Sequence, residues 1–313
     1  MIRALSTTLL LLLTPAVAAE TISDDKLVVE AKLPTASYGL ASGFDSLWSM
    51  QGSDLLRIDP DDNSIAKIAI PRSRSGIRTV AVGEGAVWLP DGNSDAIYKV
   101  DPATSQVTLT IPIDLPDASA ATIGVGAGSI WVMSRGGGKA WVGRYSAATG
   151  AEEARIPVRA SGFSVVFEGD AVWVSGTYKN EVYRIDPSTN TLVATLKVAG
   201  GPRQLTAGPG ILWVQASGDG GQIHRIDPVT NEVVATIATE TGLDDFASAA
   251  TGGGYLWASY HEGFLLQVDP ASNAIVRRYE GDLLQGYTIA FVDESIWLAG
   301  YGAAIYRITP PRQ

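Results

Sequence analysis

One tryptophan returns about every forty residues along the chain, and each copy follows an aliphatic residue. The seven copies are Trp48, Trp88, Trp131, Trp173, Trp213, Trp257 and Trp297. Six of the seven units continue into an aliphatic-acid-proline turn or a close relative of it, as in Ile58-Asp59-Pro60 and Ile185-Asp186-Pro187. A strand-rich unit repeated at this period is typical of a propeller blade. The repeat therefore predicts an all-β fold with seven blades.

Each repeat unit contains four short stretches with the composition of β-strands. In the fourth unit these stretches are residues 164–167, 171–175, 181–185 and 191–196. Asp186-Pro187 and Asn190 lie between the last two stretches. Proline fixes φ there, aspartate accepts backbone N–H bonds, and asparagine tolerates the left-handed conformation that closes a turn. We therefore predict four-stranded antiparallel blades.

The last repeat unit is short of one strand. The chain ends at Gln313, soon after a third strand expected at 305–308, while residues 27–34 match the pattern of the fourth strand at 192–196. Pairing of this N-terminal strand with the last blade would close the ring and remove two exposed sheet edges, which invite aggregation. We predict that closed seven-bladed β-propeller. The alternative is an open array of six blades with a frayed end.

The first nineteen residues lie outside the repeats and have the pattern of an export signal. Arg3 gives a basic start, Leu9–Leu13 form a short apolar run, and Ala16-Val17-Ala18 supplies the small residues of a cleavage site. The apolar run is too short to span a membrane. We predict a signal peptide at 1–19, a propeller at 20–313 and a mature protein that is periplasmic or secreted. The alternative is a retained anchor.

Composition narrows the class of partner. The chain has no cysteine, so neither disulfides nor a lipid-anchored cysteine is expected. Its formal net charge of -10 repels nucleic acid phosphates and anionic lipid headgroups. Two separated histidines and scattered carboxylates offer no ligand set for zinc, calcium or magnesium, so we expect no metal and no cofactor. We expect a monomer without membrane insertion, whose partner is a small molecule or another exported protein.

A second regularity lies ten residues before each tryptophan. The residues at this position are Tyr38, Arg78, Ala121, Phe163, Arg203, Ala247 and Tyr287. Because the spacing is constant, they occupy one equivalent place, at the start of the innermost strand of each blade, which lines the channel of a propeller. Their spacing is constant whereas their chemistry varies, so this ring marks the candidate site.

Loops between the second and third strands open on the same mouth of the channel. Arginine binds carboxylate or phosphate through two parallel hydrogen bonds. We therefore predict that a small anionic or sugar-like ligand is bound by residues of the ring and of these loops: Tyr38, Arg78, Arg203, Tyr287, Asp91, Tyr260 and His261. The alternative is that the arginines pair with acids such as Asp91 or meet water, and that His261 is a solvated loop residue. His224 falls where other units carry tyrosine, and we expect it to be structural.

Two stretches closely resemble the YVTN-type β-propeller repeat, residues 182–190 (VYRIDPSTN) and 223–231 (IHRIDPVTN). Together with the aliphatic-tryptophan strand, they make the whole mature chain similar to the virginiamycin B lyase (streptogramin lyase) propeller family. The resemblance implies a seven-bladed fold. It also implies a lyase whose catalytic histidines follow proline at the start of the innermost strands, with an acid after the tryptophan in a Trp-Phe-Thr-Glu pattern.

The chain departs from that family at the positions that would carry the chemistry. The pair equivalent to proline-histidine is Pro202-Arg203, and only Asp91 is acidic among the residues three places after each repeat tryptophan. Arginine stays protonated and is a poor general base. We therefore predict a binding protein. The alternative is a lyase or hydrolase with non-standard site residues, in which the ring arginines hold the substrate and Tyr38, Tyr287 or His261 moves protons.

Overall fold

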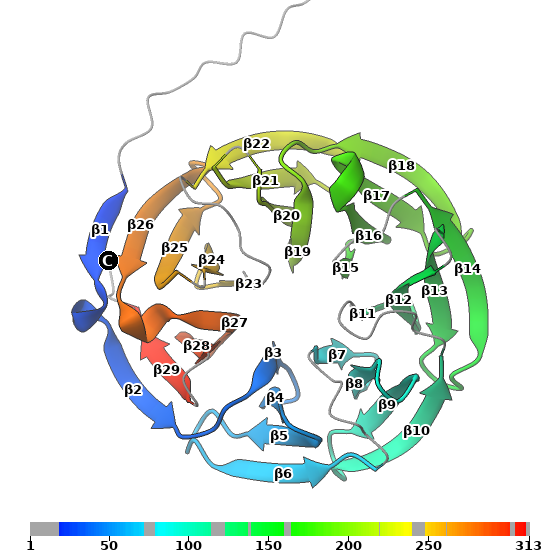
Figure 1. Cartoon of the computed structure of the whole chain (residues 1–313), viewed down its shortest axis with the longest axis horizontal. Helices are drawn as coiled ribbons and strands as arrows, with labels where there is room; N and C mark the ends of the chain where they lie inside the picture. Colours follow the sequence, from blue (N-terminus) through cyan, green and yellow to red (C-terminus); the bar gives the residue numbers. More distant parts are fainter. Residues whose placement is uncertain are drawn as a thin grey trace, which may run out of the picture.

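Seven sheets radiate from a central axis, each with its first strand innermost and its last strand on the rim (Figure 1). The computed structural model describes residues 19–71, 79–113, 123–136, 139–159, 164–218, 220–239, 248–260, 262–300 and 304–310. Within each blade, neighbouring strands run antiparallel. The predicted seven-bladed β-propeller is confirmed.

The blades follow one another in chain order around the ring. Blades 1 and 2 are β3 (Tyr38–Ser42), β4 (Leu47–Gln51), β5 (Asp54–Ile58) and β6 (Ile65–Ala69), then β7 (Ala81–Gly83), β8 (Ala86–Asp91), β9 (Ala96–Asp101) and β10 (Gln106–Pro112). Blades 3 and 4 are β11 (Ile123–Gly126), β12 (Ser129–Gly136), β13 (Lys139–Ser146) and β14 (Glu152–Val158), then β15 (Val165–Glu168), β16 (Ala171–Gly176), β17 (Glu181–Asp186) and β18 (Thr191–Lys197). Blades 5 and 6 are β19 (Pro202–Gly208), β20 (Ile211–Ala216), β21 (Gln222–Asp227) and β22 (Glu232–Ala238), then β23 (Ser248–Gly252), β24 (Tyr255–Tyr260), β25 (Phe264–Asp269) and β26 (Ala274–Glu280). Blade 7 is β27 (Gly286–Val292), β28 (Ser295–Gly300), β29 (Ile305–Thr309) and β2 (Val28–Leu33).

The N-terminal strand closes the ring, as the sequence predicts. β2 pairs antiparallel with β29, from Val28 opposite Thr309 to Leu33 opposite Ile305. Glu30 on β2 forms an ion pair with Arg307 on β29 at 2.8 Å. The seventh blade is thus built from both ends of the described chain.

A further N-terminal strand was not anticipated from the sequence. β1 (Glu20–Ser23) adds to the rim of blade 6 as a fifth strand, parallel to β26. The 3-10 helix η1 (Asp24–Lys26) connects β1 to β2, and the Asp24 carboxylate accepts the Leu283 backbone N–H at 3.0 Å. These four residues carry no clear strand pattern, so no feature of the sequence predicts this pairing.

The repeated tryptophans form a hydrogen bond within their own blade and pack against the next blade. All seven are at most 2% exposed. In five blades the indole N–H donates to the carbonyl five residues earlier, in the turn between the first and second strands: Trp48 to Gly43 (2.9 Å), Trp88 to Gly83 (3.0 Å), Trp131 to Gly126 (3.1 Å), Trp173 to Glu168 (3.4 Å) and Trp257 to Gly252 (3.1 Å). A buried N–H without a partner is costly, so this bond lets a large side chain fill the interface between blades.

In most blades an arginine or lysine side chain lies over the indole ring. Cations at this position donate a hydrogen bond to the next blade, and this bond is called a clasp below. Arg57, Lys99, Arg144, Arg184 and Arg307 lie 4.9 to 5.7 Å from the centre of their tryptophan ring. Five cations at this position donate to a turn carbonyl of the following blade: Arg57 to Pro102 (2.9 Å), Lys99 to Ala147 (2.7 Å), Arg144 to Pro187 (2.5 Å), Arg225 to Pro270 (2.7 Å) and Arg307 to Pro60 (2.5 Å). The last bond runs from blade 7 to blade 1, so the clasps cross the closure as well.

The inner strands interlock by matching small residues with large ones. A Cβ added at Gly126 would lie 2.3 Å from the Phe167 ring of the next blade, and one added at Gly252 would lie 2.0 Å from Phe291. Where the equivalent residue is larger, as at Glu168, the next blade carries the small Ala207. Because the inner strands crowd around the axis, only such complementary pairs fit.

The two faces of the ring differ in kind. On one face, here called the turn face, lie the turns between first and second strands and between third and fourth strands. On the other face, here called the mouth, the inner strands begin and the second strands end. Asp59, Asp101, Asp186, Asp227 and Asp269 each accept a backbone N–H two residues later on the turn face. The turn chemistry predicted from the Asp-Pro motif is therefore present.

Candidate functional site

The inner strands begin with a β-bulge wherever the structure describes the strand at its ring residue. The register shifts beside Tyr38 on β3, at Arg203 on β19 and at Tyr287 on β27. A bulge inserts one extra residue and re-aims its side chain, and bulges are frequent beside active sites. The ring position thus lies at or beside an irregularity of the inner strand in all three of these blades. Arg78 and His261, the other basic members of the predicted site, lie outside the described residues.

The segment that leads to Arg203 is held by hydrogen bonds on both sides. Residues of the neighbouring turns make four of these bonds: the Val198 N–H donates to the Asn180 carbonyl (2.9 Å), the Gly201 N–H to Asn180 Oδ1 (2.8 Å), Thr177 Oγ1 to the Pro202 carbonyl (2.6 Å) and the Gly218 N–H to the Gly200 carbonyl (2.6 Å). Thr177 belongs to the 3-10 helix η3 (Thr177–Lys179), which Asn180 ends in the left-handed conformation. The backbone that carries the partly buried Arg203 is thus fixed before any ligand arrives.

His224 adds a fifth bond to the same segment. Its Nε2 lies 3.1 Å from the Ala199 carbonyl and its Nδ1 lies 2.9 Å from Thr236 Oγ1. Because a carbonyl only accepts, the proton is assigned to Nε2 and Nδ1 accepts from the hydroxyl. Burial lowers the pKa of His224, which keeps the ring neutral. The expectation that His224 is structural is met. Its role in supporting the segment before Arg203 is a contact that the repeat pattern did not reveal.

Just below the mouth, a buried layer of second-strand side chains is apolar in blades 1 to 3 and polar in blades 4 to 6. Two residues after each tryptophan, blades 1 to 3 carry Met50, Pro90 and Met133, whereas blades 4 to 6 carry Ser175, Gln215 and Ser259. The inner strands opposite the second group are polar too, because Gln204 pairs with Gln215 and Ser248 with Ser259. In blade 4 the Ser164 N–H donates to Ser175 Oγ at 3.0 Å. Arg203 lies in the middle of this polar half, on blade 5.

A buried polar cluster lies beneath Arg203, between blades 5 and 6. Gln215 and Tyr260 are each 1% exposed, and neither the Gln215 amide nor the Tyr260 hydroxyl makes a hydrogen bond of standard geometry with a described residue. Burial raises the pKa of Tyr260 to about 12, and the adjacent Gln215 and Thr239 side chains lower it only in part. Tyr260 therefore stays protonated near neutral pH. Its ring stacks at 4.5 Å on Phe264 of the same blade, and both rings belong to a core cluster that includes Ile223 and Ile237 of blade 5, so the tyrosine is part of the blade interface.

Asp91 is used in a turn. It is fully buried at the end of β8, where its carboxylate accepts the N–H groups of Asn93 (3.0 Å) and Ser94 (3.2 Å) and the Ser94 hydroxyl (2.9 Å). Asp-Gly-Asn-Ser is a composition typical of such turns. That signal was available in the sequence. Of the predicted site residues whose side chains the structure describes, it thus leaves Tyr38, which is 43% exposed, and the partly buried Arg203 at the mouth; the side chain of Tyr287 lies outside the described part.

The described residues contain neither a metal site nor a helix fit for a membrane. Among them, no three His, Cys, Asp or Glu side chains are grouped as metal ligands. No helix in the described part of the chain is long and apolar enough to span a bilayer. The only helices described are 3-10 turns of three residues, η1, η3 and η4 (Asp282–Leu284).

Comparison with known proteins agrees with the architecture. Residues 204–306, about a third of the chain, match a family described as "Repeat of unknown function (DUF6923)". The match spans blades 5 to 7. No curated protein matches the chain. Among solved structures, virginiamycin B lyase from Staphylococcus aureus is similar at a TM-score of 0.75 and 18% identity, over 91% of this chain and 100% of that one. The chain therefore has the fold of a virginiamycin B lyase-like seven-bladed propeller.

Proposed function

We propose that this protein is exported and binds a small anionic or sugar-like molecule at the mouth of the propeller, with Arg203 as the central contact. The observation that carries the proposal is the support of Arg203. Its preceding segment, residues 198–202, takes part in five hydrogen bonds and ends in a bulge. Because this backbone is already held, only the Arg203 side chain has to be ordered when its guanidinium binds a carboxylate or phosphate in a two-bond geometry.

The surroundings of Arg203 favour a polar ligand. Gln204 and the η3 loop flank it, and Tyr178 and Lys179 of that loop are exposed. Lysine and arginine attract an anion, while tyrosine offers both an apolar face and a hydroxyl, which suits a sugar ring. Tyr38 and Tyr287 of the ring would provide the same chemistry from blades 1 and 7, with Arg78 and His261 as further predicted contacts. Asp91 and Tyr260 would act indirectly, by holding a turn and a blade interface of the mouth.

A thermal-shift screen of sugar acids, organic acids and aromatic acids tests this proposal. We expect a hit to raise the melting temperature of the wild type, and Arg203→Ala to abolish that shift while leaving the melting temperature without ligand nearly unchanged. Arg203→Lys should retain a weaker response, because it keeps the charge and loses the fork. Arg155→Ala is the matched control, since Arg155 is a half-exposed arginine on the outer strand β14. A full ligand response in Arg203→Ala would rule out this site.

The second candidate is a lyase or hydrolase at the same mouth, which the likeness of fold to virginiamycin B lyase favours. Proton transfer would then fall to His261, Tyr38 or Tyr287. The buried His224 has both ring nitrogens engaged, and Tyr260 keeps its proton at neutral pH. Incubation with virginiamycin B and mass spectrometry of the product would test this candidate. An intact substrate after prolonged incubation would leave binding as the function.

Export has its own test. Expression of the full chain and of a chain lacking residues 2–19 in a bacterial host, followed by fractionation, should place only the first in the periplasm or medium. Cytoplasmic retention of both would contradict the proposed signal peptide.

A further inference from the structure

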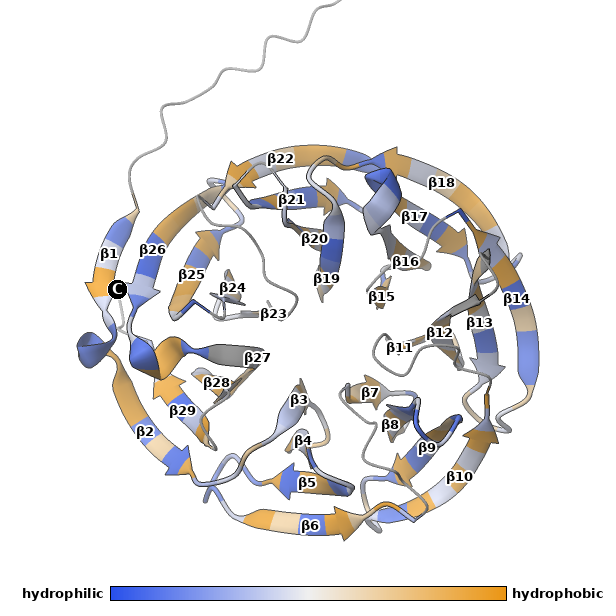
Figure 2. Cartoon of the chain, viewed as in Figure 1, coloured by the Kyte–Doolittle hydropathy of each residue, from blue (hydrophilic) through white to orange (hydrophobic). Residues whose placement is uncertain are grey.

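The outer strands form the rim of the ring and end their sheets. An edge strand presents unpaired N–H and C=O groups that can pair with another chain, and proteins block such edges with bulges, prolines, charges or a covering segment. Figure 2 shows that the outer strands carry hydrophobic as well as hydrophilic residues. How each edge is blocked therefore decides where another polypeptide can add.

A bulge interrupts six of the seven outer strands. In β10, β14, β18, β22, β26 and β2 the extra residue is Thr108, Glu153, Val193, Val234, Val276 and Glu30. β6 of blade 1 is the exception, because it pairs with β5 in unbroken register from Ile65 opposite Ile58 to Ala69 opposite Asp54. A bulge twists an edge away from a neighbour, so the flat β6 is better suited to accept a strand.

Other devices protect the remaining edges. β10 and β14 contain Pro112 and Pro157, β18 ends in Lys197, and β26 is covered by β1. At the position equivalent to Pro112 and Lys197, β6 carries Ala69. Lys67 is the only charge within β6, and its ammonium group is drawn to Gln51 Oε1 at 2.7 Å. The edge of β6 is therefore the least protected of the seven.

The hydrogen bonds of β5 show which groups of β6 face the rim. Asp59 N–H donates to Ser64 C=O, and Ile70 N–H donates to Ser53 C=O. Because bonded and non-bonded pairs alternate in an antiparallel ladder, Ala66 and Ile68 bond to β5. Ile65, Lys67 and Ala69 then direct their N–H and C=O groups to the free edge.

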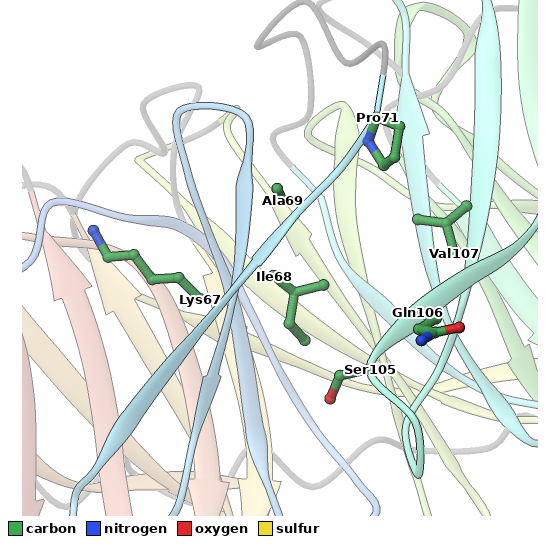
Figure 3. Close-up of a pocket in the computed structure, with 7 residues that line it drawn as sticks. All are labelled: Lys67, Ile68, Ala69, Pro71, Ser105, Gln106 and Val107. Atoms are coloured by element: carbon green, nitrogen blue, oxygen red, sulfur yellow. The ribbon is translucent and has the colours of Figure 1, made fainter.

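A groove of about 470 Å³ lies beside this edge. It is lined by Lys67, Ile68, Ala69 and Pro71 of blade 1 and by Ser105, Gln106 and Val107 of blade 2. Figure 3 shows the side chain of Ile68 directed toward blade 2 and that of Lys67 directed away from it. The groove thus joins an apolar floor to an open backbone edge.

The molecule itself shows that a rim edge of this ring accepts a strand. β1 pairs with β26 from outside, in parallel, through residues 20–23. The same arrangement is open at β6, which lies at the rim of blade 1 (Figure 1).

We propose that β6 binds an extended segment of a partner protein as a fifth strand of blade 1, with small apolar side chains over the groove and an acidic residue opposite Lys67. Main-chain bonds supply affinity in this mode and alternate side chains supply specificity. The charge of Lys67 argues against a second copy of this chain. An antiparallel twofold pairing centred on β6 would place two copies of Lys67 opposite each other, and like charges there are destabilising.

The probes are nine-residue peptides of alternating threonine and valine with glutamate, glutamine or lysine at the centre. We expect the glutamate peptide to bind the purified protein about tenfold more tightly than the lysine peptide, because cross-strand charge attraction replaces repulsion. Binding should slow hydrogen exchange at Lys67 and Ala69. Lys67→Pro, which removes one rim-facing N–H, should abolish binding, whereas Thr195→Pro at the equivalent place in β18 should not.

Lys67→Glu keeps the test decisive if the proline variant folds poorly. It should reverse the order of the peptides, so that the lysine peptide binds best. Absence of binding by all three peptides, protection of another outer strand, or equal binding by Lys67→Pro would overturn the proposal. Self-association of the protein through β6 in sedimentation experiments would also overturn it, in favour of a second copy as the occupant.

Discussion

The turn face and the mouth of this propeller are built from the same repeat, yet the repeat units are alike on the turn face and differ at the mouth. On the turn face, five blades make one and the same clasp from a cation to the next blade's turn carbonyl. At the mouth, equivalent positions carry tyrosine, arginine, phenylalanine or alanine. The repeated contacts therefore hold the ring together, whereas the positions at which the repeat units differ mark the surface that is free to take on a function.

Even the exceptions on the turn face have structural reasons. In blade 6 the clasping cation is replaced by Gln267, and the next blade has no turn between its third and fourth strands, because β2 arrives from the N-terminus. The cation would have no carbonyl to reach. In blade 4, Arg184 bonds instead to Asp170 of its own blade at 2.6 Å. These differences give matched pairs with which the role of each face can be tested.

Removal of the closing strand should have the largest effect. Deletion of residues 20–33 removes β2, the ion pair of Glu30 with Arg307 and the buried Leu33. We expect a loss of more than about 4 kcal/mol in the free energy of unfolding, or failure to fold. Deletion of residues 20–23 alone removes only β1, which is mostly exposed, and should cost about 1 kcal/mol or less. Denaturant unfolding measures both. A melting temperature of the longer deletion within a degree or two of the wild type would contradict closure by β2.

A single methyl group on an inner strand should have the next largest effect. Gly252→Ala places a Cβ 2.0 Å from Phe291 of blade 7, and such overpacking costs about 1 to 3 kcal/mol. Phe291→Ala in the same chain should relieve the clash, so the double variant should lose less than the sum of the single losses. Chemical denaturation of the three variants checks this. Additive losses would mean that the two blades do not interlock at this pair.

The clasps themselves can be compared within the repeat. Arg225 donates to Pro270 C=O and to Asn273 Oδ1 of the next blade, so Arg225→Ala leaves two partly buried acceptors without this donor and should cost about 1 to 3 kcal/mol. Arg184→Ala is the matched control, because Arg184 bonds the 86% exposed Asp170 carboxylate, and such pairs contribute about 1 kcal/mol or less. Unfolding free energies of equal size for the two variants would show that the clasp adds no stability of its own.

The fold could be predicted from the sequence because its determinants are local and repeated. The tryptophan period, the Asp-Pro turns and the strand pattern at 27–34 each report on one blade at a time. β1 could not be predicted in this way, since its partner β26 lies about 250 residues away and its four residues have no period.

The candidate site could be predicted only in part, because side-chain direction depends on packing. Counting back from the tryptophan located Arg203 but not the bonds from Thr177, Asn180 and His224 that hold its segment. Tyr260 illustrates the limit. It lies three residues after Trp257, so it points to the opposite face of its strand and into the interface with blade 5. A loop position in the sequence did not distinguish a buried tyrosine from one that faces the channel.

The smallest predicted effect is a dependence on pH, and it links the stability of the folded ring to ligand binding at the mouth. Burial lowers the pKa of His224 in the folded protein below its ordinary value of 6.5. The unfolded chain then binds a proton more readily, so stability is lost as pH falls below 6.5 toward the folded-state pKa, and above 6.5 this residue adds no pH dependence. The carboxylates with lowered pKa values, such as Asp101 and Glu181, affect stability only at more acidic pH.

We expect about 1 kcal/mol less stability at pH 5.5 than at pH 7.5 in the wild type, and a flatter profile of stability against pH in His224→Gln, which can still donate to the Ala199 carbonyl. Because His224 supports the segment before Arg203, the ligand response at the mouth should weaken over the same pH range. Unfolding curves and thermal shifts measured in parallel at the two pH values would show whether stability and binding change together; identical profiles for the wild type and His224→Gln would mean that this histidine does not couple them.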